Sequence, residues 1–269
     1  MFKKLKRRVK AFFQPNYYEI ARMNSYLLAA KTVNGNTFPK YKDSNVGKEI
    51  AICGAGPTFK KYIPLKGVKH VALNRALLND KIKFDYFIAD DYAGVNFMMD
   101  YLEKYDCIKF MGHQIQPSGL NEREIPETFA RRCKAERYYT DSFMVPNGYE
   151  SVLVSDIDSL PIGNMPNIAL SAMQIILYTN PKRIYLVGCD ASANGHYTET
   201  GISDKQKKEH QKDLEVAVSN DTVINCWKYL KRFIETYYPD IEIVSVNPVG
   251  LKGIFKDSYQ DEKGELKYE

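Results

Sequence analysis

Four short apolar segments of the sequence are each followed directly by glycine, amide or carboxylate residues. Such residues bind nucleotides and sugars through backbone N–H groups, hydrogen bonds and charge. Because the carboxyl ends of parallel strands meet at one edge of a sheet, we expect these groups to share one binding crevice. They are Gly54, Ala55, Gly56, Pro57 and Thr58, then Asn74 and Arg75, then Asp90 and Asp91, and finally Asp190, Ser192, Asn194, His196 and Tyr197.

The stretch ICGAGPTF, residues 52–59, indicates a buried strand that ends in a tight glycine turn. A helix beginning near Thr58 would offer free N–H groups to an anion. A dinucleotide fingerprint requires a third glycine where Phe59 stands, and an acid where Asn74 and Arg75 end the second strand. The sequence therefore disfavours a dinucleotide, and equally a methyl donor, while a purely structural turn stays open.

The polar pairs after the second and third strands each allow two interpretations. Asn74 and Arg75 could bind a base or sugar edge and a phosphate, or could be a helix cap and a surface arginine. Asp90 and Asp91 could hold a divalent metal or a ribose, or could be a helix cap and a solvated carboxylate.

The five cysteines include no Cys-x-x-Cys pair and have no histidine at ligand spacing. This pattern predicts neither a structural zinc nor a disulfide framework, and indicates a reduced, cytoplasmic protein. No apolar run approaches the length of about 18 residues that a membrane-spanning helix needs.

Short segments rich in valine, isoleucine and aromatic residues alternate with helical patterns after residue 48. Strands separated by helices predict an α/β fold, a single Rossmann-like doubly wound and mostly parallel sheet. The expected strands are residues 49–53, 70–74, 84–89, 107–111, 183–187 and 241–246, and the expected helices are 92–105, 166–178 and 222–238.

The remaining segments divide the chain into parts. Residues 16–48 are expected to form an N-terminal extension, and residues 49–255 a Rossmann-like domain with the binding crevice. Within it, the Pro-, Asn- and Gly-rich stretch 112–165 indicates an insertion around a site, and 198–221 a lid. Residues 256–269 are expected to be a flexible tail.

The N-terminal segment carries the positive charge of the chain. Six of the 38 Lys and Arg residues lie in residues 1–13, so the rest has 32 basic against 33 acidic residues. Apolar residues in this segment recur at helical spacing, and Pro15 ends the pattern. Residues 1–15 are therefore predicted to form a basic amphipathic helix. Residues 1–13 would attach the protein reversibly to an anionic membrane, as a peripheral protein on the inner face of the cytoplasmic membrane, with a solvated basic terminus as the alternative. A near-neutral body argues against nucleic acid as the partner.

The motifs ICGAGPTF, ALNRA, FDYFIADDY and RIYLVGCDASANGHY, in this order, resemble those of the bacterial lipooligosaccharide sialyltransferases. A more distant similarity links the chain to the motility-associated-factor flagellin glycosyltransferases and to the archaeal pterin diphosphokinases. The resemblance covers about residues 49–250 and diverges between 112 and 162. It implies transfer of a sialic-acid-like sugar, with inversion, from a CMP-linked donor to a surface glycan or glycolipid of lipopolysaccharide or capsule. It implies that no metal or other cofactor is required.

The resemblance also implies roles for particular residues. Residues 54–58 would cradle the donor phosphate and ribose, and Asn74, Asn167 and Asp190 would lie at the donor. Tyr197 matches a tyrosine that binds the departing phosphate. The chain departs from the family pattern in having Ala55 where the family usually has Asn, and Ser192 near the position of a second tyrosine.

The family's catalytic histidine, just before the last helix, is absent from the stretch EVAVSNDT, residues 215–222. A histidine is the usual group to take the acceptor proton. His196 is the first candidate and His210 the second, with Asp90 or Asp91 as an alternative, while His70 and His113 are interpreted as structural.

Two other functions stay open at this point. One is a Mg²⁺-dependent diphosphokinase of the pterin type, in which Asp90 and Asp91 would hold the metal. The other is a catalytically inactive nucleotide-binding module.

Overall fold

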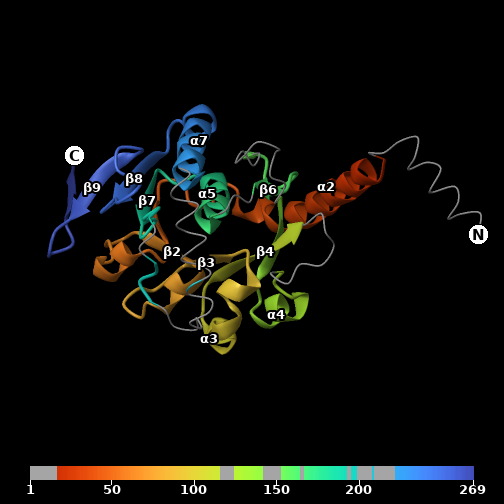
Figure 1. The fold of residues 1–269 in the computed structure, drawn as a ribbon, viewed down its shortest axis with the longest axis horizontal. Coiled ribbons are helices and arrows are strands. Elements are labelled where there is room, and N and C mark those ends of the chain that lie inside the picture. Colours follow the sequence, from red (N-terminus) through yellow and green to blue (C-terminus); the bar gives the residue numbers. More distant parts are fainter. Residues whose placement is uncertain are drawn as a thin grey trace, which may run out of the picture.

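A computed structural model describes most of the chain (Figure 1). The N-terminal basic segment, Asn194, His210 and nearly all of the expected lid lie outside the described residues, as do parts of the expected insertion. The described residues are 17–115, 124–141, 153–163, 167–192, 195–198, 208 and 222–269.

The described strands form one sheet in the order β10-β9-β8-β7-β1-β2-β3-β4-β5-β6. Every neighbouring pair is parallel except β9 and β10, which confirms the predicted α/β, mostly parallel fold. The strands are β1 Glu49–Cys53, β2 Lys69–Leu73, β3 Tyr86–Ala89, β4 Ile108–Ile115, β5 Glu136–Asp141, β6 Ile162–Gly163, β7 Arg183–Val187, β8 Glu242–Val246, β9 Lys256–Gln260 and β10 Leu266–Tyr268.

Helices cover both faces of this sheet (Figure 1). The α-helices are α2 Tyr17–Thr37, α3 Met99–Lys104, α4 Glu127–Arg132, α5 Ile168–Tyr178 and α7 Thr222–Tyr237. The 3-10 helices are η1 Pro39–Tyr41, η2 Pro57–Lys61, η3 Asn74–Leu78, η4 Tyr92–Gly94 and η5 Asn96–Met98. In Figure 1, α5 and α7 lie above the sheet and α3 and α4 below it.

Two apolar cores follow from the alternation of side chains along each strand. In β1, Ile50 and Ile52 join the core that contains α5 and α7, whereas Ala51 and Cys53 join the core on the opposite face. Ten of the eleven residues of α5 are buried, as expected for a helix that is apolar all round and packed between a sheet and a second helix.

The order of the strands places the loops after β1 and β7 side by side. The chain runs from β1 outward through β2 to β6, and then returns so that β7 pairs with the other side of β1. Cys53 and Val187, the last residues of these strands, are partners in the ladder. In a doubly wound sheet this switch point is where ligands bind.

Four segments differ from what the sequence predicted. Residues 256–269 are not a flexible tail, because β9 extends the sheet beside β8 and β10 folds back on it. The helix expected at 92–105 is divided into η4, η5 and a six-residue α3. The helix expected from Thr58 is the five-residue 3-10 helix η2. In the N-terminal extension, the sequence pattern predicts a helix at about residues 18–31, whereas α2 continues to Thr37.

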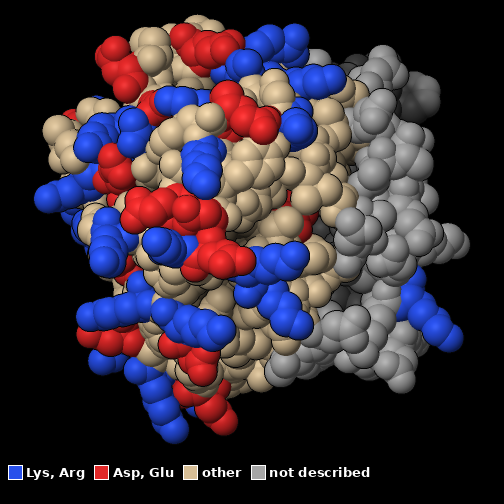
Figure 2. Space-filling model, turned by 90° about the vertical axis from the view of Figure 1, so that its left-hand side faces the viewer, with Lys and Arg blue, Asp and Glu red and all other residues tan. Residues whose placement is uncertain are grey.

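Acidic and basic side chains are interspersed on the face at the β9 end of the sheet (Figure 2). Ion pairs join neighbouring strands across this end: Lys256 lies 2.6 Å from Glu242, and Arg183 bridges Glu242 and Glu49. Opposite charges on adjacent strands support the parallel pairing of β1, β7, β8 and β9.

Candidate active site

The turn after β1 and the turn after β7 approach each other backbone to backbone. A Cβ atom on Gly54 would lie 2.6 Å from the Gly188 carbonyl oxygen, and one on Gly188 would lie 2.6 Å from the Gly54 oxygen. The Gly54 N–H donates to the Val187 oxygen and the Gly56 N–H to the Gly188 oxygen, both at 2.8 Å. The glycines of the loop are therefore required by loop-to-loop packing.

The carboxylate of Asp190, in the turn after β7, hydrogen-bonds to the turn after β1. It is buried, accepts a hydrogen bond of 2.9 Å from the Thr58 N–H, and accepts a second one from the Thr58 hydroxyl. A Cβ on Gly56 would lie 2.6 Å from Asp190 Oδ2, so only glycine fits beneath the carboxylate. The Asp190 carbonyl oxygen accepts a hydrogen bond of 2.8 Å from the Gly250 N–H, so the loop after β8 is also held against this turn.

The expected free N–H groups are thus not free at three positions of the loop. Gly54, Gly56 and Thr58 all donate to acceptors within the protein. The prediction that the start of a helix offers them to an external anion is wrong, because the anion at this helix start is the side chain of Asp190. Contact of a donor with Ala55 or Pro57 stays a prediction.

Residues 195–198 lie over the glycine loop and join it to the end of β2. The Tyr197 N–H donates to the Ala55 oxygen at 2.8 Å, and the Tyr197 hydroxyl donates to the Arg75 oxygen at 2.9 Å. Its ring packs edge-on against Phe59, with 5.1 Å between centroids. Burial raises the pKa of Tyr197 to about 12, so the phenol keeps its proton as a hydrogen-bond donor. His196 is half-buried in the same segment.

Asn74 and Arg75 follow β2 as predicted, and both side chains are held inside the structure. Asn74 has a left-handed backbone with φ of 48°, and its buried Oδ1 has no hydrogen-bond partner. The Arg75 side chain is buried, lies 5.3 Å above the ring of Phe97, and directs Nη1 toward the Thr198 oxygen. The residue with the unpartnered amide oxygen is therefore followed directly by a buried arginine.

Asp90 is buried at the end of β3, beneath α5. Its Oδ1 accepts a hydrogen bond from the Tyr138 hydroxyl, whereas its Oδ2 lies near the Ser171 hydroxyl without a hydrogen bond of good geometry. Burial raises the pKa of Asp90 to about 6, although the Tyr138 and Ser171 hydroxyls act in the opposite direction. Asp91 begins η4, where its carbonyl oxygen accepts from the Gly94 N–H at 3.1 Å.

The other predicted site residues take different positions. Asn167 caps α5, because its Oδ1 accepts from the Ala169 N–H at 3.0 Å. The Ser192 hydroxyl oxygen is buried without a partner beyond β7. Among the described residues, no group of three or more His, Cys, Asp or Glu side chains is arranged to hold a metal ion.

Unpartnered polar atoms are concentrated at this edge of the sheet. Of the seven buried side-chain atoms in the described residues that lack a hydrogen-bond partner, four lie here. Most buried polar groups in proteins are hydrogen-bonded, since an unpaired one costs about 1–3 kcal/mol. The four atoms are Asn74 Oδ1, Asp90 Oδ2, Ser171 Oγ and Ser192 Oγ.

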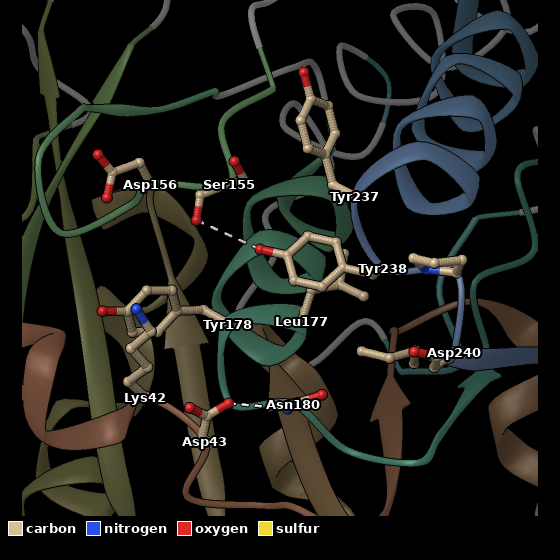
Figure 3. A pocket seen from close by; sticks show the side chains of 12 residues that line it. Lys42, Asp43, Ser155, Asp156, Leu177, Tyr178, Asn180, Tyr237, Tyr238 and Asp240 are labelled. Atoms are coloured by element: carbon tan, nitrogen blue, oxygen red, sulfur yellow. Dashed lines mark hydrogen bonds between the residues drawn. The ribbon is translucent and has the colours of Figure 1, made fainter.

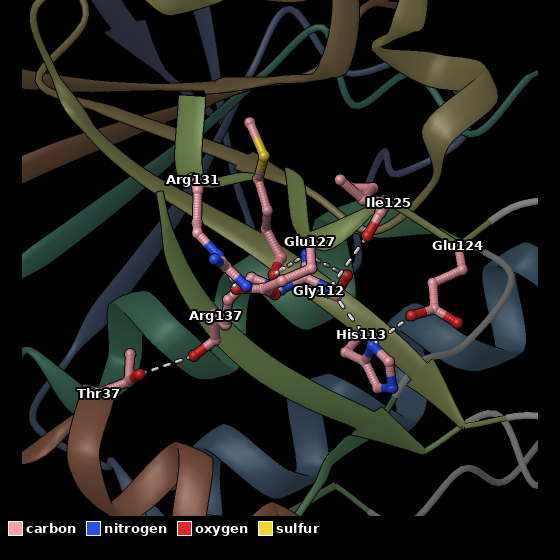
Figure 4. Close-up of polar contacts among 9 residues, drawn as sticks. Thr37, Gly112, His113, Glu124, Ile125, Glu127, Arg131 and Arg137 are labelled. Atoms are coloured by element: carbon pink, nitrogen blue, oxygen red, sulfur yellow. Dashed lines mark hydrogen bonds and ion pairs between the residues drawn. The ribbon is translucent and has the colours of Figure 1, made fainter. Parts of the chain in front are cut away.

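A polar cluster around His113, at the end of β4, was not anticipated from the sequence (Figure 4). His113 Nδ1 lies 2.6 Å from Glu124 Oε1 and 3.3 Å from Arg137 Nη2. Arg137 also donates to the carbonyl oxygens of Met111, Gly112 and Ile125. No sequence signal pointed to this cluster, because β4 extends past His113 to Ile115 and Glu124 comes from outside the strand.

A separate pocket of about 410 Å³ lies at the opposite edge of the sheet, near the starts of β7 and β8 (Figure 3). Tyr178, Tyr237 and Tyr238 line it together with Asp156 and Lys42. None of the residues predicted to bind a donor contributes to its lining.

No family model matches the chain, and no curated protein matches it significantly. Solved structures with a similar fold include the sialyltransferase Cst-II in complex with a trisaccharide acceptor and CMP, at 17% identity over 74% of this chain and 80% of that chain, with a TM-score of 0.45. CstII from Campylobacter jejuni in complex with the substrate analogue CMP-3FNeuAc has 16% identity, the same coverage and a TM-score of 0.43. The MAf glycosyltransferase from Magnetospirillum magneticum AMB-1 has 11% identity over 91% of this chain but 39% of that chain, with a TM-score of 0.49. At these identities the likeness concerns the fold and assigns no activity.

The loop packing predicts unequal effects of two glycine substitutions. Gly188 and Gly253 both have a left-handed backbone, with φ of 61° and 76°, but only the Cβ added at Gly188 would meet other atoms within 4 Å. Gly253→Ala should lower the free energy of unfolding by about 1–2 kcal/mol through the backbone alone. Gly188→Ala should lower it by about 1–3 kcal/mol more through the steric clash. Urea denaturation of both variants measures the difference, and equal losses would contradict the packing described.

Asp90 should make the stability of the protein depend on pH. Its carboxyl has a pKa of about 6 in the folded protein, against the ordinary 3.8 of an aspartate, so between these values the folded state holds a proton that the unfolded state has released. The stabilising contribution is complete below about pH 4 and is lost as pH rises to about 6, by on the order of 3 kcal/mol. Asp90→Asn should remove this dependence. Urea unfolding of wild type and variant from pH 4 to 7 checks it, and parallel pH curves would refute the assignment.

Proposed function

We propose that the protein is a glycosyltransferase that moves a sialic-acid-like sugar, with inversion, from a CMP-linked donor to a hydroxyl of a surface glycan or glycolipid. The observation that carries the proposal is the set of buried, unpartnered polar atoms at the carboxyl edge of the sheet, together with the buried side chain of Arg75, the residue that follows Asn74. A nucleotide with its ribose hydroxyls, base amide and phosphate has complementary groups for such an edge.

In this proposal, side chains bind the nucleotide-sugar donor, and the N–H groups of the glycine loop do not. The Asn74 amide oxygen would accept from the base or ribose, and the positive charge of Arg75 would lie toward the phosphate. The Tyr197 hydroxyl, which now donates to the Arg75 carbonyl, would turn toward the phosphate oxygen. Donors aimed at an oxygen that gains negative charge stabilise the transition state most.

The reaction would be a single displacement. The bond between the anomeric carbon and the phosphate oxygen breaks, CMP leaves with the electron pair, and the acceptor oxygen bonds to the opposite face of the carbon. The acceptor proton passes to a base on the protein.

Donor binding can be tested by thermal denaturation with CMP, and with CMP-, UDP-, GDP- and CDP-linked sugars. A ligand that binds the native state raises the melting temperature by mass action, so CMP and CMP-sialic acid should give the largest shifts. Equal shifts for all nucleotides, or none with CMP, would refute the proposed donor class. Loss of sugar transfer in EDTA would instead indicate a metal-dependent reaction.

The role of Asn74 can be separated from its backbone conformation with a matched pair of variants. Asn74 and Asn180 both have a left-handed backbone, with φ of 48° and 58°, but Asn180 lies at the opposite edge of the sheet. Asn74→Gly should weaken CMP binding about tenfold through loss of one buried hydrogen bond, whereas Asn180→Gly should leave it unchanged. Calorimetric titration with CMP measures both, and equal affinities would exclude Asn74 from the donor site.

Attachment to a membrane is proposed to rest on residues 1–13. None of the helices in the described ranges combines the length and the apolar character needed to cross a bilayer. Each of the six basic residues of the segment would contribute roughly 1 kcal/mol at an anionic surface. Removal of residues 1–13 should abolish co-sedimentation with phosphatidylglycerol vesicles, and the full chain should not sediment with phosphatidylcholine alone. Unchanged sedimentation of the truncated protein would refute this.

A further inference from the structure

His113 lies at the same edge of the sheet as the candidate donor site. Strand β4 is separated from β2 only by β3, and Gly112, the residue before His113, packs against the carboxyl group of Asp90. Leu73 at the end of β2 is level with Ile88 and Phe110, and His113 lies three residues beyond Phe110. With strands about 4.8 Å apart and a rise of about 3.3 Å per residue, His113 lies roughly 14 Å from the end of β2. A sugar attached to a nucleotide at Asn74 spans a distance of this order.

Two groups contact Nδ1 of His113, Glu124 Oε1 at 2.6 Å and Arg137 Nη2 at 3.3 Å. The guanidinium can only donate and the carboxylate accepts, and because the carboxylate is the nearer of the two we assign the proton to Nδ1. Nε2 then carries the lone pair, and it has no hydrogen-bond partner among the described residues. The side chain of His113 is 31% exposed, which leaves the ring accessible from solvent.

Burial, rather than the neighbouring carboxylates, favours the neutral form of the His113 ring. Burial is the largest effect and lowers the pKa of His113, and the nearby Arg137 lowers it further, while Glu124 and Glu127 raise it. Arg137 is itself fixed by three backbone carbonyls and lies 3.3 Å from Glu127, so its charge cannot move away from the ring. The ring of Tyr139 packs against His113 at 4.5 Å and limits its rotation.

We propose that His113 is the general base that takes the proton of the acceptor hydroxyl through Nε2, and that Glu124 is the positioning residue that holds Nδ1. The proposal rests on the glycosyltransferase function proposed above. The acceptor O–H bond breaks as the new bond to the anomeric carbon forms, the proton passes to Nε2, and Glu124 stabilises the resulting imidazolium. A carboxylate, a histidine and a free ring nitrogen in this order are the arrangement that activates hydroxyl nucleophiles.

Activity measurements test the base. The donor is CMP-sialic acid, and the acceptor is lactose. His113→Gln should lower kcat at least a hundredfold while leaving CMP binding within twofold. Glu124→Gln should lower kcat less and move the acidic limb of the pH profile of kcat/KM to lower pH, because the carboxylate that raises the pKa of His113 is gone.

A matched control is Glu103→Gln, which removes a glutamate that forms an ion pair of the same 2.6 Å length with Arg132, remote from His113. It should change neither kcat nor the pH profile. If His113→Gln keeps its activity, if His196→Gln alone loses it, or if Glu124→Gln only lowers the melting temperature, the base assignment is overturned.

A direct titration separates this inference from the proposed function. In NMR spectra of the full chain, the His113 ring resonance should titrate at lower pH in Glu124→Gln than in wild type, whether or not the sugar donor is correct. An unchanged titration would overturn the His113–Glu124 pair. A wild-type protein that shows this titration but neither binds CMP nor turns over CMP-sialic acid would refute the proposed function instead.

Discussion

The structure of the carboxyl edge depends on one close approach, that of the turns after β1 and β7. The carbonyl oxygens of Gly54 and Gly188 each occupy the space that a Cβ atom on the other residue would need. Between the two turns, the Asp190 carboxylate accepts hydrogen bonds from the N–H and the hydroxyl of Thr58. Parallel pairing of β1 and β7 brings the turns together, but only turns without side chains can meet at this distance. The loop then holds Tyr197 through the Ala55 carbonyl, and Tyr197 in turn holds the backbone of Arg75.

The alternation of side chains along β4 and β5 assigns the polar groups to two sides of the sheet. Gly112 and Tyr138 are partners in the ladder and face α5, where they enclose Asp90. His113 and Tyr139, one residue further on, face the opposite side together with Arg137. A buried carboxyl that keeps its proton to about pH 6 and a histidine oriented by a carboxylate therefore lie on opposite faces of the same two strands.

The sequence predicted the sheet and the edge at which polar residues gather. Both depend only on short apolar segments and on the residues that directly follow them, which can be identified without knowing any long-range contact. The sequence did not predict which backbone N–H groups were already bonded, since the acceptor of Thr58 is Asp190, 132 positions away. It assigned a flexible tail to residues 256–269, because β9 has the polar sequence KDSYQ and is ordered by pairing with β8 and β10. His113 was interpreted as structural because Glu124 comes from outside its strand, and spacing gives no sign that the two meet.

The internal role of Asp190 limits how a donor can be bound. A glycine turn followed by a helix start commonly binds phosphate through its N–H groups, but here a carboxylate of the same chain occupies them. A phosphate placed against this loop would face Asp190 at close range, and two like charges in a buried site repel strongly. The phosphate of the proposed donor must therefore lie away from Asp190, toward the guanidinium of Arg75 and the hydroxyl of Tyr197. This displacement moves the sugar along the edge toward β3 and β4, the side on which His113 lies.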